Sequence, residues 1–404
     1  MFNMNRAIML STVSITNMMM IICGKTFEMR GKKMPSSNNS NIVCKASPHT
    51  VKKIELIESY VKSWAQKLMQ NNYCNGIIFI DCMCNSSVYH DENGNEVYGT
   101  PIRISRILRD VAGQYPRKKV YIYLNDNSQE KIDELKKHLP GGSSNFRYSI
   151  TCKDGNALLK DIGSKLSNGA RLHFFLLYDP YDASIDWDAL APFFRSWGEV
   201  LINHMVNDSI RAIRQVKSPK AVQKYEDTYL SAFEDLLPYG SDKVAYEKRV
   251  EQIITSLQSG SGRKYYIASF LFFNSRNSLL YDLVHCTCHE AGFKLYKTTA
   301  WKTFGGRSSI KNTHGEENQF VIDFTDQRVK TQSDERCYYV KDIVDYLQAK
   351  YVGQHDVPLA TIWTDLDAHP VFPSDGYRAE IKSGLKCDYG AKISRSTISF
   401  TDRR

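Results

Sequence analysis

The chain has 404 residues, of which 42% are hydrophobic and 24% are charged. This length exceeds one ordinary domain, and the composition excludes a largely disordered chain, a collagen-like chain and a protein that crosses a membrane many times. Lys and Arg number 53 against 44 Asp and Glu, a formal charge of +9. An excess of this size permits a polyanionic partner but does not require one.

The first 46 residues form an ambiguous leader. Arg6 precedes a mostly apolar run from Ala7 to Cys23, as in a signal peptide, but polar residues interrupt the run and no clean cleavage site follows. The run is also too broken for a membrane span, which needs roughly 20 apolar residues. We expect a disordered leader or a start codon assigned too early, and no membrane association. A secretory or anchoring signal is the alternative.

Helices and short apolar strands alternate beyond the leader. A helix is predicted over 51–70, and an Asn-Gly turn within 91–96 predicts a hairpin. The predicted strands are 76–81, 119–125, 147–152, 171–178 and 199–203, separated by predicted helices 102–112, 129–138, 156–166 and 188–197. Such alternation predicts a parallel sheet with helices on both faces.

The rest of the chain departs from this rhythm. Residues 207–262 are polar and helical with Pro breaks, which indicates a helical insertion or lid. A strand over 265–274, a helix over 279–292 and a strand over 319–324 are then predicted. The last segment, 336–404, contains three helical stretches followed by β structure, which is the order of a winged helix.

Most of the ten cysteines are isolated, and they do not form the framework of a small disulfide-rich domain, so we expect reduced thiols and a cytoplasmic location. The run His285-Cys286-Thr287-Cys288-His289 contains ligands that zinc favours, but its spacing is wrong for a structural zinc site. The predicted helix would also point the two thiols to different faces. We therefore expect core packing here and no metal.

Polar side chains stand where the predicted parallel strands end, the edge at which such sheets bind ligands. Asp81 ends the first strand, Asn125 and Asp126 end the second, and Asp154 follows the third. At the second strand an acid can accept from ribose hydroxyls, a role for Asp126 with Asn125 beside it, while Asp154 would receive an exocyclic amine. The set predicts a nucleotide-like cofactor. For each acid alone, the alternative is that it caps the following helix.

Asp179-Pro180-Tyr181 is the sharpest local motif, because it follows an apolar strand and should lie at the mouth of the sheet. An acid beside an aromatic ring can hold a planar amine: the ring stacks on the base, and the acid accepts from the amino group. We predict that these three residues form the catalytic turn.

Several further motifs occur in order through residues 47–404. They include Phe79-Ile80-Asp81, Tyr98-Gly99-Thr100-Pro101, Tyr178-Asp179-Pro180-Tyr181, Leu201-Ile202-Asn203, Gly292-Phe293-Lys294 and Trp301-Lys302, with His49-Thr50 and Lys53 before them and Arg395 to Phe400 after them. In order and spacing these motifs resemble the three-Cys-motif partner proteins (TcmP).

The resemblance implies a Rossmann-like, class I methyltransferase-like core over 47–335 that uses S-adenosylmethionine (SAM), followed by a winged-helix domain over 336–404. It also implies a partner that looks like a radical-SAM enzyme and carries the three-Cys motif. The Asp-Pro-Tyr turn is similar to that of nucleic-acid amino-methyltransferases, which suggests a base amine as acceptor. On a winged helix, Arg395 and its neighbours would contact phosphates of DNA or RNA.

One turn departs from the family pattern. The family's first strand runs into Asp-Gly-Phe-Ala-Gly-Pro-Gly, whereas this chain has Asp81-Cys82-Met83-Cys84-Asn85-Ser86-Ser87. Glycine allows a tight turn and a close approach to a ligand. The sequence therefore leaves two hypotheses: a working methyltransferase, and a catalytically degenerate protein that recruits a partner enzyme or nucleic acid.

Overall fold

The computed structural model describes residues 43–91, 93–166, 168–216, 218–236, 244–259, 264–274, 277–310 and 337–402. The leader up to residue 42 and the strand expected over 319–324 lie outside the described residues.

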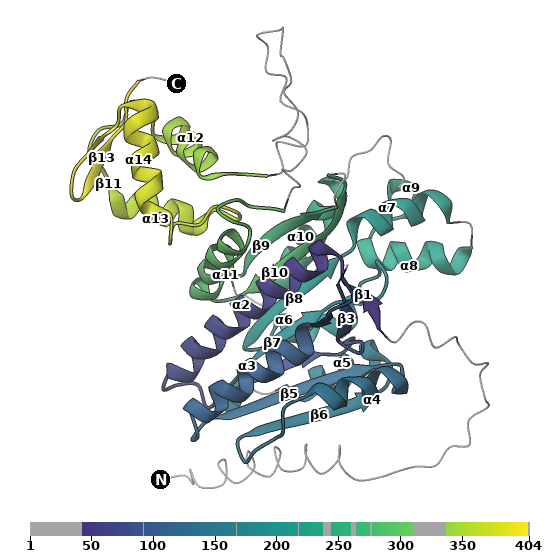
Figure 1. Cartoon of the computed structure of the whole chain (residues 1–404). Coiled ribbons are helices and arrows are strands. Elements are labelled where there is room, and N and C mark those ends of the chain that lie inside the picture. Colours follow the sequence, from purple (N-terminus) through teal and green to yellow (C-terminus); the bar gives the residue numbers. More distant parts are fainter. Residues whose placement is uncertain are drawn as a thin grey trace, which may run out of the picture. The chain divides into compact units, whose positions relative to one another are not determined.

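A seven-stranded sheet has the order β6–β5–β2–β7–β8–β10–β9 (Figure 1). Its strands are β2 (Gly76–Asp81), β5 (Lys119–Asp126), β6 (Phe146–Cys152), β7 (Leu172–Tyr178), β8 (Gly198–His204), β9 (Tyr266–Phe273) and β10 (Leu279–Thr287). β5 runs parallel to β2 and β6, whereas β10 runs antiparallel to β8 and β9. The expected mixed α/β, Rossmann-like core with a mostly parallel sheet is confirmed.

The chain divides into two compact units, and the first comprises the described residues up to Ala46 and those from Ala65 to Phe174. Its helices are α3 (Thr100–Gln114), α4 (Gln129–His138), α5 (Gly155–Ser164) and a short 3₁₀ helix (Asn168–Ala170). β3 (Val88–His90) and β4 (Glu96–Tyr98) form the predicted hairpin, with Gly94 at φ 81° in its turn, and β1 (Cys44–Lys45) pairs with β3. β2 is buried along its whole length, which explains its uninterrupted apolar run.

The second unit comprises residues Ser47–Trp64, from α2 (Pro48–Gln70), and the described residues from Phe175 onward. Its core helices are α6 (Trp187–Phe194), α7 (Val206–Gln215), α8 (Pro219–Tyr229), α9 (Phe233–Leu236), α10 (Val244–Ser259) and α11 (Glu290–Thr303). Four of them, α7 to α10, lie between β8 and β9 in the chain, where a helical insertion is predicted.

The helix predicted over 279–292 is wrong. Residues Leu279–Thr287 form β10, and a helix begins only at Glu290. β10 pairs with a neighbour on each side and is buried on both faces, so its sequence shows no alternation of polar and apolar residues. Polar Asp282 and His285, three residues apart, imitate a helical period, and a short apolar run does not by itself distinguish the two structures.

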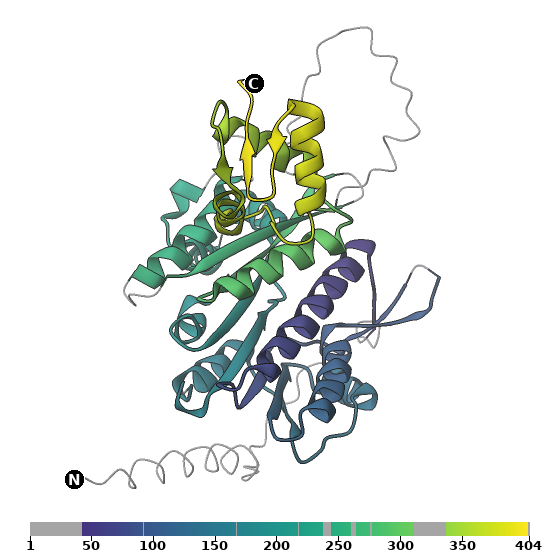
Figure 2. The same cartoon turned by 90° about the vertical axis from the view of Figure 1, so that its left-hand side faces the viewer.

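Residues 337–402 form what we call the C-terminal module. It contains α12 (Val340–Tyr351), β11 (Val357–Pro358), α13 (Leu359–Ala368), α14 (Arg378–Tyr389), β12 (Lys392–Ile393) and β13 (Thr397–Ser399). The strands form an antiparallel sheet in the order β11–β13–β12, and Figure 2 shows the hairpin of β12 and β13 beside α14.

Lys297 of α11 fastens the end of α13. Its ammonium group is fully buried, and its three N–H groups are shared among four carbonyl oxygens, those of Leu366, Asp367, His369 and Phe372, at 2.6–3.0 Å. Carbonyls at a helix C-terminus lack intrahelical donors, and a cation there suits the helix dipole. Burial nevertheless lowers the pKa of Lys297 to about 7. The lysine thus serves as a C-terminal cap supplied by another helix.

His369 orders the same loop from within. Its Nδ1 accepts from the backbone amides of Val371 (3.2 Å) and Phe372 (3.0 Å), and its ring stacks on Phe372 with 4.0 Å between centroids. An Nδ1 that accepts must be unprotonated. Burial, assisted by the charges of Lys297 and Lys350, lowers the pKa of His369 to about 4.

A helix long and apolar enough to cross a bilayer does not occur among the residues described.

Replacing Lys297 with Ala should lower the free energy of unfolding by about 2–4 kcal/mol, because four buried carbonyls lose their donor. Denaturant unfolding followed by circular dichroism measures this loss. Lys302→Ala, an exposed position on the same helix, is the matched control and should cost under about 0.5 kcal/mol. Equal effects of the two changes would contradict the capping role.

Stability should fall as the pH falls from about 6.5 to about 4. The unfolded chain protonates His369 near its ordinary pKa of about 6.5, whereas the folded chain resists protonation until about 4, so the unfolded state binds more protons in this window. The Tm measured at pH 7, 6 and 5 should decrease stepwise. His369→Asn keeps an acceptor but does not titrate, and it should reduce the decrease. An unchanged pH profile in this variant would contradict the assignment.

Candidate functional site

The side chain of Asn125, buried at the end of β5, joins three segments of the first unit. Its Nδ2 donates to the carbonyl oxygens of Cys82 (3.0 Å) and Lys153 (2.9 Å). Its Oδ1 accepts from Thr151 Oγ1 (2.7 Å) and from Lys153 N (3.0 Å). An Asn amide offers two donors and two acceptor positions, and all four are used here. Asn125 therefore fixes the turn after β2 against the end of β6.

Asp126, which has no exposed surface, binds two turns at once. Its Oδ2 accepts from Asn85 N (3.0 Å), in the turn after β2, and its Oδ1 accepts from Ser128 N (2.9 Å), after β5. Asp81, also buried, accepts from Met83 N (3.1 Å) in the turn after β2. Both acids thus order strand-end turns. Each carboxylate oxygen can accept more than one hydrogen bond, so a cofactor role for these acids stays a prediction.

Asp154 lies at the N-terminus of α5, and its Oδ1 accepts from Ala157 N at 2.8 Å. This is the N-cap geometry that the sequence leaves open as the alternative for an acid at a strand end.

The turn after β2 keeps a glycine-like backbone without glycine. Asn85 (φ 56°) and Ser87 (φ 57°) both adopt the left-handed conformation. In the resemblance, the family has glycine at these two positions, and Asn is one of the few other residues that tolerate this conformation. The Oδ1 of Asn85 accepts from Ser86 N (2.8 Å), and Ser87 Oγ donates to the carbonyl of Cys84 (2.9 Å). The turn therefore accommodates two left-handed residues without glycine, supported by its own side chains.

The turn after β2 packs closely against the start of α5. A Cβ at Gly155, the first residue of α5, would lie 2.7 Å from the carbonyl oxygen of Cys82 and 3.1 Å from side-chain carbons of Met83. The turn and the helix start are therefore in close contact. Burial raises the pKa of the Cys82 and Cys84 thiols, which keeps them protonated and unreactive.

In the second unit, the carboxylate of Asp179 is held from two sides at the end of β7. Its Oδ2 forms an ion pair with Lys53 Nζ of α2 at 2.7 Å, and its Oδ1 accepts from Asn203 Nδ2 of β8 at 2.6 Å. The side chain of Lys53 is 14% exposed to solvent, and that of Asp179 is 28% exposed. A half-buried pair of this kind is positioned more firmly than a surface ion pair. The sequence singles out Lys53 and Asn203 only as part of the family resemblance. Lys53 is 126 residues and Asn203 is 24 residues away from Asp179 in the chain, so no local sequence pattern indicates these contacts.

The aromatic ring of Tyr281 lies near the Lys53–Asp179 ion pair. The Lys53 ammonium lies 5.4 Å from the centre of the Tyr281 ring, and the Tyr281 hydroxyl donates to the carbonyl of His49 (3.1 Å). Burial first, and the charge of Asp179 second, raise the pKa of Tyr281. Burial and the charge of Lys53 lower the pKa of His49. At neutral pH, Asp179 thus has the Lys53 cation and the neutral phenol of Tyr281 as neighbours.

The rest of the predicted catalytic turn differs in exposure. Pro180 is buried, whereas Tyr181 exposes 51% of its surface. The buried Asn203 Oδ1, next to the Asp179 contact, has no hydrogen-bond partner within the described chain. The turn therefore presents a fixed carboxylate and an accessible aromatic ring, a combination suited to an amine on a planar ring.

Among the described residues, no group of three or more His, Cys, Asp or Glu side chains is arranged to hold a metal ion. His285 instead contacts Glu199 (Nε2 to Oε2, 2.9 Å), and the Tyr60 hydroxyl donates to the same oxygen. His289 Nε2 accepts from Trp197 Nε1 (3.0 Å).

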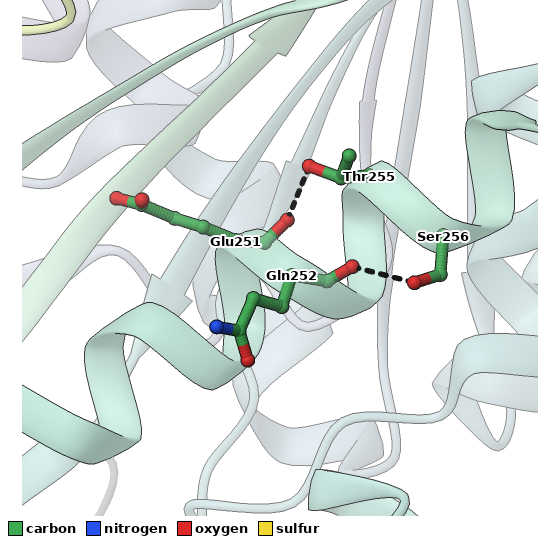
Figure 3. Close-up of a pocket in the computed structure, with 4 residues that line it drawn as sticks. All are labelled: Glu251, Gln252, Thr255 and Ser256. Carbon is green, nitrogen blue, oxygen red and sulfur yellow. Dashed lines mark hydrogen bonds between the residues drawn. The ribbon is translucent and has the colours of Figure 1, made fainter.

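A cavity of about 360 Å³ lies along α10 and is lined by Glu251, Gln252, Thr255 and Ser256. The two hydroxyls donate to carbonyls four residues earlier, as Figure 3 shows, and Glu251 Oε1 accepts from Ser269 Oγ (2.7 Å). Among the described residues, the lining comes from a single helix, and none of the predicted site residues contributes to it. We assign it no function.

No protein-family model matches the sequence, and no curated protein matches it. Three solved structures are similar in part. A protein of Legionella pneumophila described by the family model DUF519 is 11% identical, with a TM-score of 0.37 over 61% of this chain and 91% of its own. Human methyltransferase-like protein 13, in complex with SAH, is 7% identical, with a TM-score of 0.31 over 63% and 92%. Loganic acid methyltransferase with SAH is 8% identical, with a TM-score of 0.26 over 65% and 87%. Similarities this low assign no function.

Asn125→Ala should destabilise the protein by about 2–4 kcal/mol, because it leaves buried backbone groups at two strand ends without partners. Denaturant unfolding measures the loss. Asn75→Ala removes one hydrogen bond from an exposed Asn to the carbonyl of Ala170 and is the control, with an expected loss under about 1 kcal/mol. If Asn125→Ala unfolds at the wild-type midpoint, the amide does not bind the turns together.

Proposed function

We propose that the protein is a SAM-dependent, methyltransferase-like enzyme that acts on an amine of nucleic acid, together with a three-Cys-motif, radical-SAM-like partner. The observation that carries the proposal is the Asp179 carboxylate, fixed between Lys53 and Asn203 at the end of a strand and followed by an exposed Tyr181. The sheet order, with β10 inserted antiparallel between β8 and β9, fits the class I methyltransferase-like core that the resemblance implies.

The residues present fit the cofactor in one respect. The turn after β2 keeps left-handed backbone at two of the three glycine positions of the family, those of Asn85 and Ser87. Asp81 and Asp126 would hold SAM, with Asn125 and Asp154 fixing the turns around it. Bound SAM supplies an electrophilic methyl group.

The work of this chain is then chiefly positioning. Asp179 would accept a hydrogen bond from the acceptor amine and aim the nitrogen lone pair, while Tyr181 would stack on the ring that carries the amine. Lys53 and Asn203 keep the carboxylate in place, so that the amine meets a fixed acceptor. Pro180 restricts the backbone between the two contact residues.

A second candidate is a catalytically degenerate protein that recruits a partner enzyme or nucleic acid. The specific observation in its favour is the turn after β2, where Ser86 and Ser87 are buried and Met83 packs against the start of α5. In this reading, side chains have replaced the cofactor. Calorimetry with SAM and a pull-down from the native host together separate the two candidates: capture of a partner by a chain that binds no SAM favours recruitment.

We further propose that the C-terminal module is a winged helix. The order helix, strand, helix, helix, strand, strand supports this, as does the arrangement β11–β13–β12 of its sheet. The proposed location is a reducing cytoplasm, which agrees with the buried thiols of Cys82 and Cys84.

Isothermal titration calorimetry with SAM tests the cofactor. The wild type should bind, and Asp126→Ala should abolish binding because it removes the predicted ribose acceptor. Since Asp126 also orders two turns, Asp126→Asn and a Tm measurement accompany it: loss of binding at an unchanged Tm identifies a cofactor contact. Asp133→Ala, exposed on α4, is the control and should bind normally. No binding by the wild type at millimolar SAM would overturn the enzyme proposal.

A further inference from the structure

The C-terminal module is electrically polarised along the chain. Residues 337–368, which include α12 and α13, carry two Lys against five Asp, a net charge of −3. Residues 378–399, which include α14 and the hairpin of β12 and β13, carry three Lys and two Arg against one Glu and one Asp, a net charge of +3.

The acids of the first segment are bound to partners within the protein. Asp365 forms an ion pair with Lys350 (2.7 Å), and Asp367 forms one with Lys294 (2.6 Å). Asp345 accepts from the Tyr389 hydroxyl (2.7 Å). Their charges are therefore largely used in holding the module together.

Most cations of the second segment have no acidic partner within the described residues. Among the described residues, none of Lys382, Lys386, Lys392 and Arg395 forms an ion pair, and three of the four side chains are exposed; Lys382 is half-buried. Arg378 pairs only with Asp375, its exposed neighbour three residues earlier. An uncompensated basic surface of this size fits a polyanion.

α14 turns one face inward and leaves the other open. Ile381 and Leu385 are fully buried, and a Cβ at Gly384 would lie 2.7 Å from a methyl carbon of Val344, so the helix packs closely on α12. The exposed positions include the small residues Ala379 and Ser383 together with Lys386. A helix with short side chains on its open face can approach a partner closely.

The hairpin adds a cation at a fixed place. Arg395 lies in the turn between β12 and β13, where Ser394 Oγ accepts from the amides of Ser396 (3.2 Å) and Thr397 (2.9 Å). Within α14 itself, Arg378 and Lys382 lie over the ring of Trp363, at 5.2 and 5.8 Å from its centre. The helix and the hairpin thus each carry cations beside ordered neighbours.

We infer that α14 and this hairpin form a binding surface for double-stranded DNA, with α14 in the major groove and Lys386, Lys392 and Arg395 on backbone phosphates. The major groove of B-form DNA, about 12 Å wide, admits an α-helix, whereas the major groove of A-form RNA is too deep and narrow. The inference deepens the proposed nucleic-acid role and rests on the winged-helix arrangement, but it does not require SAM binding.

Fluorescence anisotropy of the full-length protein with a labelled 20-base-pair DNA duplex tests this surface. Binding should weaken with salt, with a slope of log K against log salt of about −3 for three phosphate contacts, or roughly 60-fold between 50 and 200 mM NaCl. Lys386→Glu combined with Arg395→Glu should reduce the slope by about 2 and weaken binding at least 10-fold. Lys341→Glu, the same charge reversal on an exposed position of α12, is the matched control and should bind nearly as wild type.

Three outcomes would overturn the inference: no binding of duplex DNA by the wild type at 50 mM NaCl, an equal loss in the Lys341 control, or equally tight binding of an RNA duplex of the same sequence. Circular dichroism verifies that the variants fold. Calorimetry with SAM on the same variants distinguishes the two proposals. A variant that loses DNA binding but still binds SAM is defective in this surface alone. A wild-type protein that binds DNA but no SAM supports the DNA-binding surface and contradicts only the proposed enzyme.

Discussion

The four hydrogen bonds of the Asn125 amide are the interaction on which the strand ends of the first unit depend. Parallel strands end in loops whose backbone groups are buried but have left the ladder, and such groups need partners. Asn125 supplies them for two loops at once, and Asp126 beside it binds backbone amides in two turns. Residues that look like a ligand-binding set in the sequence therefore first hold the loops that would surround a ligand.

In the second unit, as in the first, buried or half-buried acids accept hydrogen bonds from neighbouring donors. Lys53 and Asn203 both contact the carboxylate of Asp179, and Glu199 accepts from Tyr60 and His285 in the core. Burying an unpaired charge is costly, so each of these acids is accompanied by donors. The difference lies in access: Glu199 is enclosed, while Asp179 keeps part of its surface exposed and is followed by an exposed Tyr181. That contrast separates a structural acid from a candidate site.

Much of the sheet is predictable from the sequence, because its strands are short apolar runs that end in polar residues. Asp81 and Asp126 do end β2 and β5, and the Asn-Gly turn lies in a hairpin. β10 is missed because burial on both faces erases the alternation that identifies a strand. The partners of Asp179 are beyond sequence reasoning, because Lys53 comes from a helix far away in the chain. The N-cap role of Asp154 is weighed in advance, but only geometry reveals it.

The buried ammonium of Lys297 has a consequence for how the protein can be dissected. A fragment that began after α11 would leave four carbonyl oxygens at the end of α13 without their donor, and would also lose the hydrogen bond from Trp301 Nε1 to the carbonyl of Val371 (3.0 Å). The helices after α11 therefore belong to the same cooperative folding block as α11 itself. Any minimal version of the C-terminal module has to carry α11 with it, even though α11 precedes the module in the chain.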